Sequence, residues 1–398
     1  MVLPEDLLPL ERVSAYFHIP FCRKKCTYCA FYSETGNSTD EMRQEVFNLL
    51  EQFASFQRSL NFPVIETVYI GGGTPSCLDR ESLEILLKGI RSHLEKKEPA
   101  EWTIEANPES VDNDFLAILT EHGVTRLSVG IQSFQPHLRA CLGRLDPEDS
   151  LEKHLSFIRN SWHGNLNLDI ISGIPGQDLA GAIKDIETTV SYEPDHISLY
   201  TLSIEKGTAL ESSLKKGFYH LPGEETAEEM WLKAIERLES RGFERYEVSN
   251  FARPGRHCRH NMAYWSMRPY TGCGPTAVST LPGAKGPVRL TVNRTGQLER
   301  ENLSPHDFLI DYLLMGLRTA RGVELNDLDR LFHPGVFRQM SGLVSEWQNR
   351  GLLIHEDDRI HMTGRGMSIL DAFLREAMSL LARVSIDRIF WPHSSKTP

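Results

Sequence analysis

Residues 15–31 read AYFHIPFCRKKCTYCAF, a short apolar run followed by the thiols Cys22, Cys26 and Cys29. Thiolates spaced C-x3-C-x2-C can converge on one metal centre. A closed structural metal site uses four protein ligands, so three leave one position open to a group that is not protein. The spacing therefore predicts a metal centre that takes part in chemistry.

A zinc site is the alternative interpretation, with Cys258 or a distant His as the fourth ligand. Structural zinc sites of four Cys, or of three Cys and one His, usually consist of two separated pairs rather than one tight triplet. Unligated core thiols are a third interpretation. Arg23, Lys24 and Lys25 lie inside the loop and argue against it, because they keep the loop in water.

The composition indicates an intracellular enzyme. The 398 residues suffice for a barrel-sized domain plus a smaller one. The seven cysteines are odd in number and three form the triplet, so a reducing compartment is expected rather than a disulfide framework. Residues 1–6 lack the basic start of a signal peptide, no apolar stretch is long enough for a transmembrane segment, and a cytoplasmic location is expected. The formal charge of −11 argues against a nucleic-acid partner.

Apolar β-rich runs alternate with helical patterns through the first part of the chain. The six predicted strands are Val13–Ile19, Thr67–Ile70, Trp102–Glu105, Arg126–Ile131, Leu166–Ile171 and Ile197–Leu202. The predicted helices are Glu41–Phe56, Arg80–Leu94, Asn113–Glu121, Leu179–Val190 and Thr226–Glu239. Successive βα units imply a parallel sheet, which is either an open doubly wound sheet or a partial barrel.

Polar or glycine-rich segments follow the later strands. They are Gly71-Gly72-Gly73-Thr74-Pro75, Glu105-Ala106-Asn107-Pro108, Gly130-Ile131-Gln132-Ser133-Phe134, Asp169 with Gly173-Ile174-Pro175-Gly176-Gln177, and Ser203. A turn or a helix cap explains any one of them. Ligands of parallel βα folds bind at the carboxyl ends of the strands, so their recurrence favours one shared ligand. Glu105 and Gln132 suit ammonium, hydroxyl and carboxylate groups.

The cysteine spacing, with Tyr28 directly before Cys29, resembles the cluster motif of the radical S-adenosylmethionine (SAM) superfamily. In that superfamily the three Cys hold a [4Fe-4S] cluster whose fourth iron binds SAM, and electron transfer into the sulfonium cleaves SAM to a 5′-deoxyadenosyl radical. The resemblance implies an α/β fold with a partial (β/α)6 TIM-like barrel. It also implies an electron donor such as flavodoxin or ferredoxin.

The longer motifs are similar to those of the coproporphyrinogen III dehydrogenase-like family, which includes HemN-type oxygen-independent oxidases and HemW-type haem chaperones. The resemblance covers nearly the whole chain. It implies SAM contacts at Tyr16, Gly72, Gly73, Thr74, Glu105, Gln132, Arg144, Asp169, Ser203 and Val278. Arg144 would pair with the methionine carboxylate, with a surface salt bridge as the alternative. No residue is assigned a catalytic role.

Two features bear on the branch of this family. The oxidases carry a fourth Cys two residues after the triplet, where this chain has Phe31. Residues 260–265, HNMAYW, resemble the H-N-x-x-Y-W signature of HemW-type proteins, in which the His is implicated in haem binding. A neutral imidazole is a good axial ligand of haem iron, so His260 is a candidate ligand. Val278 stands where HemW-type chains usually have His, which is closer to the oxidase pattern.

The expected organisation is a barrel over residues 1–245, a connecting segment over 246–303 and a HemN-type C-terminal domain over 304–398. Helical patterns at Phe308–Leu317 and Val336–Trp347, a hairpin of Leu352–Ile354 with Arg359–Met362, and a helix from Gly366 resemble a small winged-helix-like α+β domain. The acidic balance favours a lid over the barrel rather than DNA binding. The tail after Arg383 is expected to be a flexible end.

Three hypotheses follow. The first is a HemW-like protein that binds haem near His260 and passes it to haem-accepting proteins. The second is a coproporphyrinogen III oxidase that decarboxylates propionate side chains in porphyrin biosynthesis. The third is a zinc-stabilised binding protein without radical chemistry.

Overall fold

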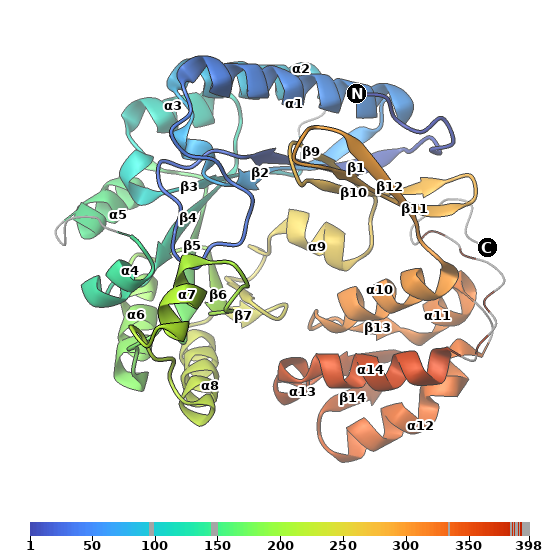
Figure 1. Ribbon diagram of the computed structural model, residues 1–398. Helices are drawn as coiled ribbons and strands as arrows, with labels where there is room; N and C mark the ends of the chain where they lie inside the picture. The colour runs from blue at the N-terminus through green and yellow to red at the C-terminus, as the bar shows by residue number, and fades with distance from the viewer. Residues whose placement is uncertain are drawn as a thin grey trace.

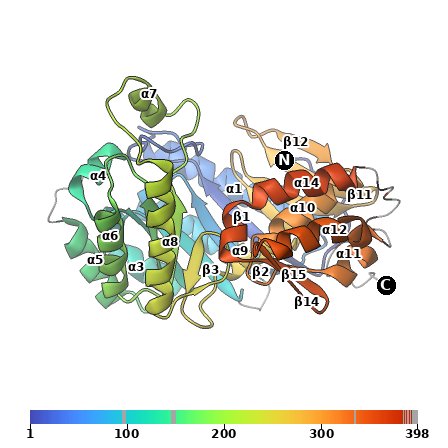
Figure 2. The ribbon, with the colours of Figure 1, turned by 90° about the horizontal axis from the view of Figure 1, so that it is seen from below.

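The computed structural model of the chain describes residues 1–94, 99–144, 150–332 and 335–382, together with residues 384, 386, 389 and 391. A curved sheet forms the larger part of the molecule, with helices along its outside, and a smaller, mainly helical unit lies beside it (Figure 1). The smaller unit is formed by the C-terminal residues, coloured orange to red in Figures 1 and 2. Among the described residues, no helix has the length and apolar composition needed to span a membrane.

Six parallel strands form the centre of the sheet. They are β1 (Arg12–Ile19), β2 (Val64–Gly72), β3 (Glu101–Ala106), β4 (Arg126–Gln132), β5 (Asn165–Ser172) and β6 (His196–Thr201). Each pairs in parallel with the next along the chain. All six strands predicted from the sequence are present, and the α/β fold class is confirmed.

The helices that follow these strands include all five predicted from the sequence, with small shifts at their ends. They are α1 (Thr39–Ser59), α2 (Arg80–Ser92), α3 (Asn113–Glu121), α4 (Pro136–Cys141), α5 (Ser150–Ser161), α6 (Leu179–Ser191), α7 (Ala209–Lys215) and α8 (Glu224–Ser240). Side-chain caps explain several starts, because Ser38, Asp79, Asp112 and Asp178 each accept a hydrogen bond from the first turn of the helix that follows. The sequence did not predict α4, α5 or α7.

Residues 246–303, expected to be a connecting segment, contribute strands to both edges of this sheet. The sheet has twelve strands in the order β12-β11-β10-β9-β1-β2-β3-β4-β5-β6-β8-β7. Residues 246–303 add β8 (Asn250–Ala252), β9 (Tyr270–Cys273), β10 (Val278–Gly283), β11 (Gly286–Val292) and β12 (Leu298–Asn302), and the preceding β7 (Glu244–Arg245) pairs with β8. They satisfy backbone groups that an isolated six-stranded sheet would leave unpaired at its edges.

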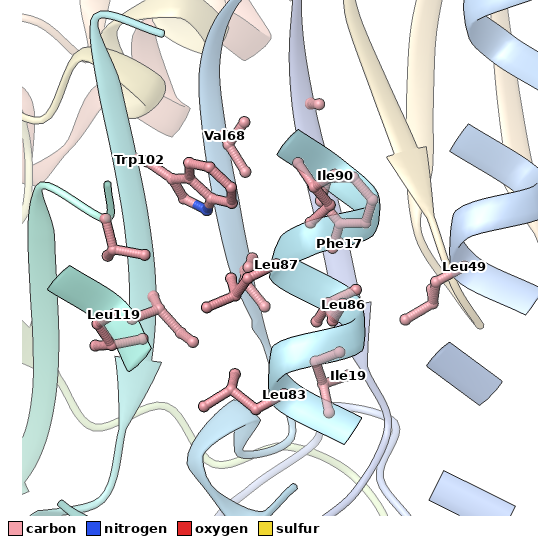
Figure 3. Packing of buried hydrophobic residues seen from close by; sticks show 14 of the residues in the cluster. Phe17, Ile19, Leu49, Val68, Leu83, Leu86, Leu87, Ile90, Trp102 and Leu119 are labelled. Carbon is pink, nitrogen blue, oxygen red and sulfur yellow. The ribbon is translucent and has the colours of Figure 1, made fainter. Parts of the chain in front are cut away.

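The two faces of the central sheet differ in polarity, because successive side chains of a strand point to opposite faces. The apolar set packs against the surrounding helices. In Figure 3, Leu83, Leu86, Leu87 and Ile90 of α2 lie against Phe17, Ile19, Val68 and Trp102 of the sheet. The alternate positions are polar and hydrogen-bond across strands, as in Thr67 to Ser14 (2.9 Å) and Asn167 to Ser128 (2.7 Å). The inner face of the sheet is therefore polar, and many of its groups hydrogen-bond one another.

The C-terminal unit has its own apolar core around Phe308, Trp347 and Phe373. Its elements are α10 (Pro305–Leu317), β13 (Val323–Glu324), α11 (Leu325–Leu331), α12 (Val336–Asn349), β14 (Leu353–Glu356), β15 (Arg359–Met362), α13 (Gly364–Ser368) and α14 (Leu370–Leu381). The predicted hairpin is present as β14 and β15, and β13 adds a third strand beside β15. Most of the tail after Arg383 lies outside the described residues.

A buried ion pair fastens the short helix α9 (Arg259–Trp265) to the amino ends of β3 and β4. Arg126 Nε donates to Glu101 Oε2 at 3.1 Å, and both side chains are nearly inaccessible to solvent. Glu101 also accepts hydrogen bonds from the backbone N–H groups of Arg259 (3.1 Å) and His260 (3.0 Å). One carboxylate thus balances the charge of Arg126 and accepts hydrogen bonds from two backbone N–H groups in the first turn of α9.

We predict that Glu101→Ala lowers the free energy of unfolding by about 3–5 kcal/mol, because it leaves Arg126 buried without its counter-charge. Urea unfolding of the variant and the wild type measures this difference. Glu101→Gln is the matched control, since it keeps the shape and one acceptor and should lose less. A loss below about 1 kcal/mol for Glu101→Ala would show that α9 is held by packing alone.

Candidate functional site

A cavity of about 630 Å³ opens at the carboxyl ends of the central strands. Its lining residues include Cys22, Lys24, Lys25, Cys26, Tyr28, Cys29, Phe31, Gly72, Gly73, Thr74, Glu105, Asn107, Ser128, Gly130, Gln132, Arg144, Asp169, Tyr200, Ser203 and Glu205. A volume of this size is typical of small-molecule and cofactor sites. Three thiols, three carboxyl groups and one guanidinium group therefore share one concave site.

Backbone hydrogen bonds and the Thr27 hydroxyl hold the cysteine loop in place. Cys22 N–H donates to Glu34 O at 2.9 Å, and Cys29 N–H donates to Cys26 O at 3.3 Å. Thr27 links the loop to the end of α4, because its hydroxyl donates to Cys141 O at 2.7 Å. The three thiols are partly exposed and line the cavity without a disulfide partner. They are available as ligands.

Glycine at position 73 allows the loop after β2 to lie directly against the cysteine loop. A Cβ atom on Gly73 would lie 2.6 Å from Phe21 O and 3.1 Å from Cys22 Sγ, which is too close for any other residue. Gly73 N–H donates to Ile19 O at 2.7 Å, and Thr74 N–H donates to Phe21 O at 2.7 Å. The glycine run thus joins the first two strand ends into one wall of the cavity.

Glu105 lies half-buried in the cavity wall at the end of β3. Its carboxylate accepts hydrogen bonds from Tyr69 Oη (2.7 Å) and from the backbone N–H of Gly72 (3.2 Å). Burial raises the pKa of Glu105 from its usual value to about 7, although the hydrogen bond from Tyr69 opposes the shift. A carboxyl group in this setting gains from pairing with a ligand cation such as an ammonium group.

Arg144 and Asp169 place opposite charges on the same cavity. Arg144 donates to Asn107 Oδ1 at 2.6 Å, and its Nε is buried with no hydrogen-bond partner among the described residues. Asp169 accepts from Asn167 (2.8 Å) and Ser128 (3.2 Å), and burial raises its pKa despite these hydrogen bonds. The free donor on Arg144 matches a ligand carboxylate.

A bulge in β4 directs Gln132 toward the cavity. The pairing with β5 shifts between Gly130 and Gln132, and Gln132 has a φ of 70°. A non-glycine residue in this left-handed region costs of order 1 kcal/mol, and such strain concentrates at ligand sites. The direction of the Gln132 side chain is therefore set by this backbone bulge and not only by the alternation of side chains along β4.

The structure brings most of the predicted site residues together. Those that line the cavity are Cys22, Cys26, Cys29, Gly72, Gly73, Thr74, Glu105, Gln132, Arg144, Asp169 and Ser203. Tyr16, Val278 and His260 are not among the lining residues. Tyr16 hydrogen-bonds His18 inside the sheet at 3.0 Å, and Val278 begins β10.

His260 lies on α9 and is buried against the inner face of the sheet. A ligand of haem iron would need a ring nitrogen that haem can reach. His260 Nδ1 hydrogen-bonds Thr67 Oγ1 at 2.8 Å, and its Nε2 hydrogen-bonds Tyr264 Oη at 2.9 Å. The ring is 1% exposed and packs against Tyr69, 5.1 Å between ring centroids. Burial lowers its pKa to about 3, so the imidazole is neutral. Both nitrogens are used in this conformation.

Cys258 cannot complete a zinc site with the triplet. It precedes α9 at the amino ends of the strands, whereas the triplet lies at the carboxyl ends, and its thiol donates to Glu101 Oε1 at 3.2 Å. Within the described parts of the chain, no group of three or more His, Cys, Asp and Glu side chains could hold a metal ion. A [4Fe-4S] cluster has a different requirement, because each thiolate binds a separate iron.

Sequence reasoning missed several residues of this site. Tyr28, Ser128 and Tyr200 line the cavity, and Tyr69 donates a hydrogen bond to Glu105; Asn107, which the sequence placed in a strand-end segment without a role of its own, also lines it. The alternation of side chains along a strand could have indicated three of them. Tyr69, Ser128 and Tyr200 lie two residues from Gly71, Gly130 and Ser198 on the same strands, and so point to the same face. Asn107 stands directly after β3 and could be taken as a turn residue.

The lining residues fit a [4Fe-4S] cluster and SAM. Three partly exposed thiols face a cavity of sufficient size, Gly73 leaves no space for a side chain between the walls, and Arg144 Nε is an unused buried donor. The cysteines would hold the cluster. Glu105, Arg144 and Asp169 offer complements to the ammonium, carboxylate and hydroxyl groups of SAM.

Comparisons with known proteins agree with this geometry. A family model described as Radical SAM superfamily matches residues 16–188, and one described as HemN C-terminal domain matches residues 303–369. The heme chaperone HemW of Lactococcus lactis is 32% identical over 365 residues, which cover 89% of this chain and 94% of that protein. The heme chaperone HemW of Mycobacterium tuberculosis is 33% identical over 388 residues, covering 92% and 95%.

The solved structure of coproporphyrinogen III oxidase (HemN) from Escherichia coli has the same fold, with a TM-score of 0.78, 96% of this chain and 91% of that chain covered, and 20% sequence identity. Fold and cavity thus define a radical SAM protein with a HemN-type C-terminal domain. Within that class, the chain belongs to the HemW-type branch of the oxygen-independent coproporphyrinogen III oxidase-like family.

The raised pKa of Glu105 predicts a pH-dependent stability difference. Between its ordinary pKa near 4.5 and about 7, Glu105 is ionised in the unfolded chain but protonated in the folded protein, so folding loses stability as pH rises. We predict that the stability of Glu105→Gln relative to wild type increases by roughly 2 kcal/mol from pH 4.5 to pH 8. Urea unfolding of ligand-free protein at both pH values measures this, and a constant difference would contradict it.

Proposed function

We propose that the protein binds a [4Fe-4S] cluster, SAM and haem, and that it delivers haem to acceptor proteins as a HemW-like chaperone. One observation supports the binding of the cluster and SAM. Three thiols, a glycine run and the charged groups of Glu105, Arg144 and Asp169 all line one cavity. The haem part is supported by the relatives called heme chaperone HemW, which align over nearly their whole length.

The cysteine loop would supply three thiolates, and the cluster would supply one-electron chemistry toward SAM. The protein's own contribution is to orient SAM and to keep water from the reacting atoms. Glu105 would hold the ammonium group, Arg144 the carboxylate, and Asp169 with Ser203 the hydroxyl groups. Gly72 and Gly73 would bring backbone N–H and C=O groups next to the ligand.

The position of Phe31 supports the chaperone over the oxidase. Its ring is 69% exposed at the mouth of the cavity, in the place where the oxidases carry a further Cys. Two relatives that are 32% and 33% identical over nearly the whole chain carry the chaperone name, whereas the likeness to the oxidase is one of fold.

Replacing a cysteine of the triplet tests the cluster directly. We predict that Cys22→Ala, after anaerobic reconstitution with iron and sulfide, loses most of the iron and the broad visible absorbance of the cluster. Cys77→Ala is the matched control, because Cys77 lies just after the glycine run but does not line the cavity. Equal iron content in the two variants would contradict the assignment.

The burial of His260 predicts a structural effect rather than loss of haem. We predict that His260→Ala lowers the free energy of unfolding by about 1–3 kcal/mol, since it leaves Thr67 and Tyr264 without their partner. Haem titration followed at the Soret band should still saturate. A folded variant without a saturable Soret band would instead make His260 the iron ligand and require α9 to open. His220→Ala, at an exposed position, is the control.

A further inference from the structure

Helix α9 lies inside the curve of the sheet, where its histidine contacts the strand that leads to the glycine run (Figure 1). Thr67 Oγ1 of β2 donates to Ser14 Oγ at 2.9 Å and lies 2.8 Å from His260 Nδ1. Because Thr67 gives its own proton to Ser14, it accepts from Nδ1–H, and Nε2 then accepts from the hydroxyl of Tyr264 at 2.9 Å. Two hydrogen bonds thus fix the orientation of the neutral imidazole ring.

Tyr69 lies two residues after Thr67 on the same face of β2, so its ring rests beside this imidazole. The ring centroids of Tyr69 and His260 are 5.1 Å apart, and the two planes are inclined by 30°. The ring of Tyr16, on β1, lies 6.2 Å from that of Tyr69 at an angle of 34°. The fixed imidazole and Tyr16 therefore limit the positions open to the Tyr69 ring.

The hydroxyl end of Tyr69 reaches Glu105 in the cavity wall. It donates to Glu105 Oε1 at 2.7 Å, while the backbone N–H of Gly72 donates to Oε2 at 3.2 Å, so each carboxylate oxygen has one donor. A Cβ atom on Gly71 would lie 2.9 Å from both Glu105 Cδ and Tyr69 Cε1, so glycine leaves the room in which this pair lies against β2. A displaced Tyr69 ring would release one of the two carboxylate oxygens.

We infer that His260 is a positioning residue for SAM, because it holds the Tyr69 ring where its hydroxyl bonds Glu105, the proposed partner of the amino group of SAM. This inference rests on the proposed function. It gives the histidine of the HNMAYW segment a role in SAM binding, exerted through Tyr69, in place of haem ligation.

The charges around Glu105 show how the loss of this hydrogen bond would be detected. Tyr16, Tyr69, Asp169 and Tyr200 are its ionisable neighbours, and burial raises the pKa of all three tyrosines, which stay protonated. Burial raises the pKa of Glu105, the charge of Asp169 adds to this rise, and the hydrogen bond from Tyr69 opposes it. The ionised carboxylate is the better acceptor for an amino group. Without the Tyr69 bond, SAM binding should therefore weaken most at acidic pH.

The first test removes the hydroxyl and keeps the ring. We expect the affinity of Tyr69→Phe for SAM to fall about tenfold at pH 6 and by a smaller factor at pH 8, because the pKa of Glu105 rises. Calorimetric titration of the anaerobically reconstituted protein with SAM at both pH values measures this. Iron content, determined for every variant, shows that the cluster is intact.

The second test removes the imidazole and asks whether it acts through Tyr69. His260→Ala should show the same pattern, with an affinity for SAM about threefold to tenfold lower at pH 6 and a smaller loss at pH 8. In the double variant Tyr69→Phe/His260→Ala, the second substitution should add almost nothing. Two groups that act through one hydrogen bond give non-additive effects, whereas general damage to the fold would add to the effect of Tyr69→Phe.

Two further variants guard against misfolding. Thr67→Val keeps the shape of its side chain but removes the acceptor of His260 Nδ1, so it should lower the affinity for SAM about twofold to fivefold at pH 6. It carries the test together with Tyr69→Phe if His260→Ala does not fold. His122→Ala is the matched control, because it removes another buried imidazole that does not line the cavity and should leave the affinity for SAM unchanged.

The possible failures point to different conclusions. A wild-type protein that takes up the cluster but does not bind SAM would refute the proposed function, and this inference with it. If wild type binds SAM, equal affinities of His260→Ala and wild type at both pH values would refute the inference alone. Effects of Tyr69→Phe and His260→Ala that add, or an equal loss in His122→Ala, would also overturn it, since His260 would then have a merely structural role.

Discussion

The close contact between the glycine run after β2 and the cysteine loop after β1 is the constraint on which the site depends. Gly73 lies against Phe21 O and Cys22 Sγ, where a Cβ atom would be only 2.6 Å and 3.1 Å away. Backbone hydrogen bonds from Gly73 and Thr74 fix this contact. Because β1 and β2 are adjacent and parallel, their carboxyl ends place thiols and free backbone groups side by side. The remaining strands add Glu105, Arg144 and Asp169 around that wall.

The polarity of the sheet explains how a stable fold can carry such a site. The outer face buries apolar side chains against helices, as Phe17, Val68 and Trp102 do against α2, and this burial supplies the main driving force for folding (Figure 3). The inner face is free to be polar because its groups satisfy one another. Asn167, for example, bonds Ser128, Asp169 and His196. The cavity is the carboxyl end of this polar inner face.

The sequence predicted the elements well, because strand and helix periodicities are local. The helix Asn113–Glu121 was predicted with its observed bounds, and β1 differs from the prediction by one residue. Most of the residues that the sequence placed at strand ends line the cavity, while their contacts with SAM stay a prediction. The sequence pattern does not show how far along its strand a residue lies from the cavity. Tyr16 precedes the end of β1 by three residues, about 10 Å, so its side chain lies below the cavity rather than in it.

The placement of α9 and of β8–β12 required tertiary information. Glu101, far earlier in the chain, accepts a hydrogen bond from the start of α9, where His260 is buried. The local sequence of residues 256–265 does not indicate this contact. The strands of residues 246–303 are short, and they pair at the two opposite edges of the sheet. Such long-range pairings depend on which edges are unpaired after the central sheet has formed.

In the function proposed above, the cavity holds SAM beside a cluster that has one iron free of protein ligands. Electron paramagnetic resonance of the reduced, anaerobically reconstituted protein, recorded with and without SAM, tests it most directly. We expect the spectrum of a reduced [4Fe-4S] cluster whose g-values shift when SAM is added, because SAM would bind at the iron that the three cysteines leave free. A cluster spectrum that SAM does not change, or the absence of any cluster signal, would contradict it.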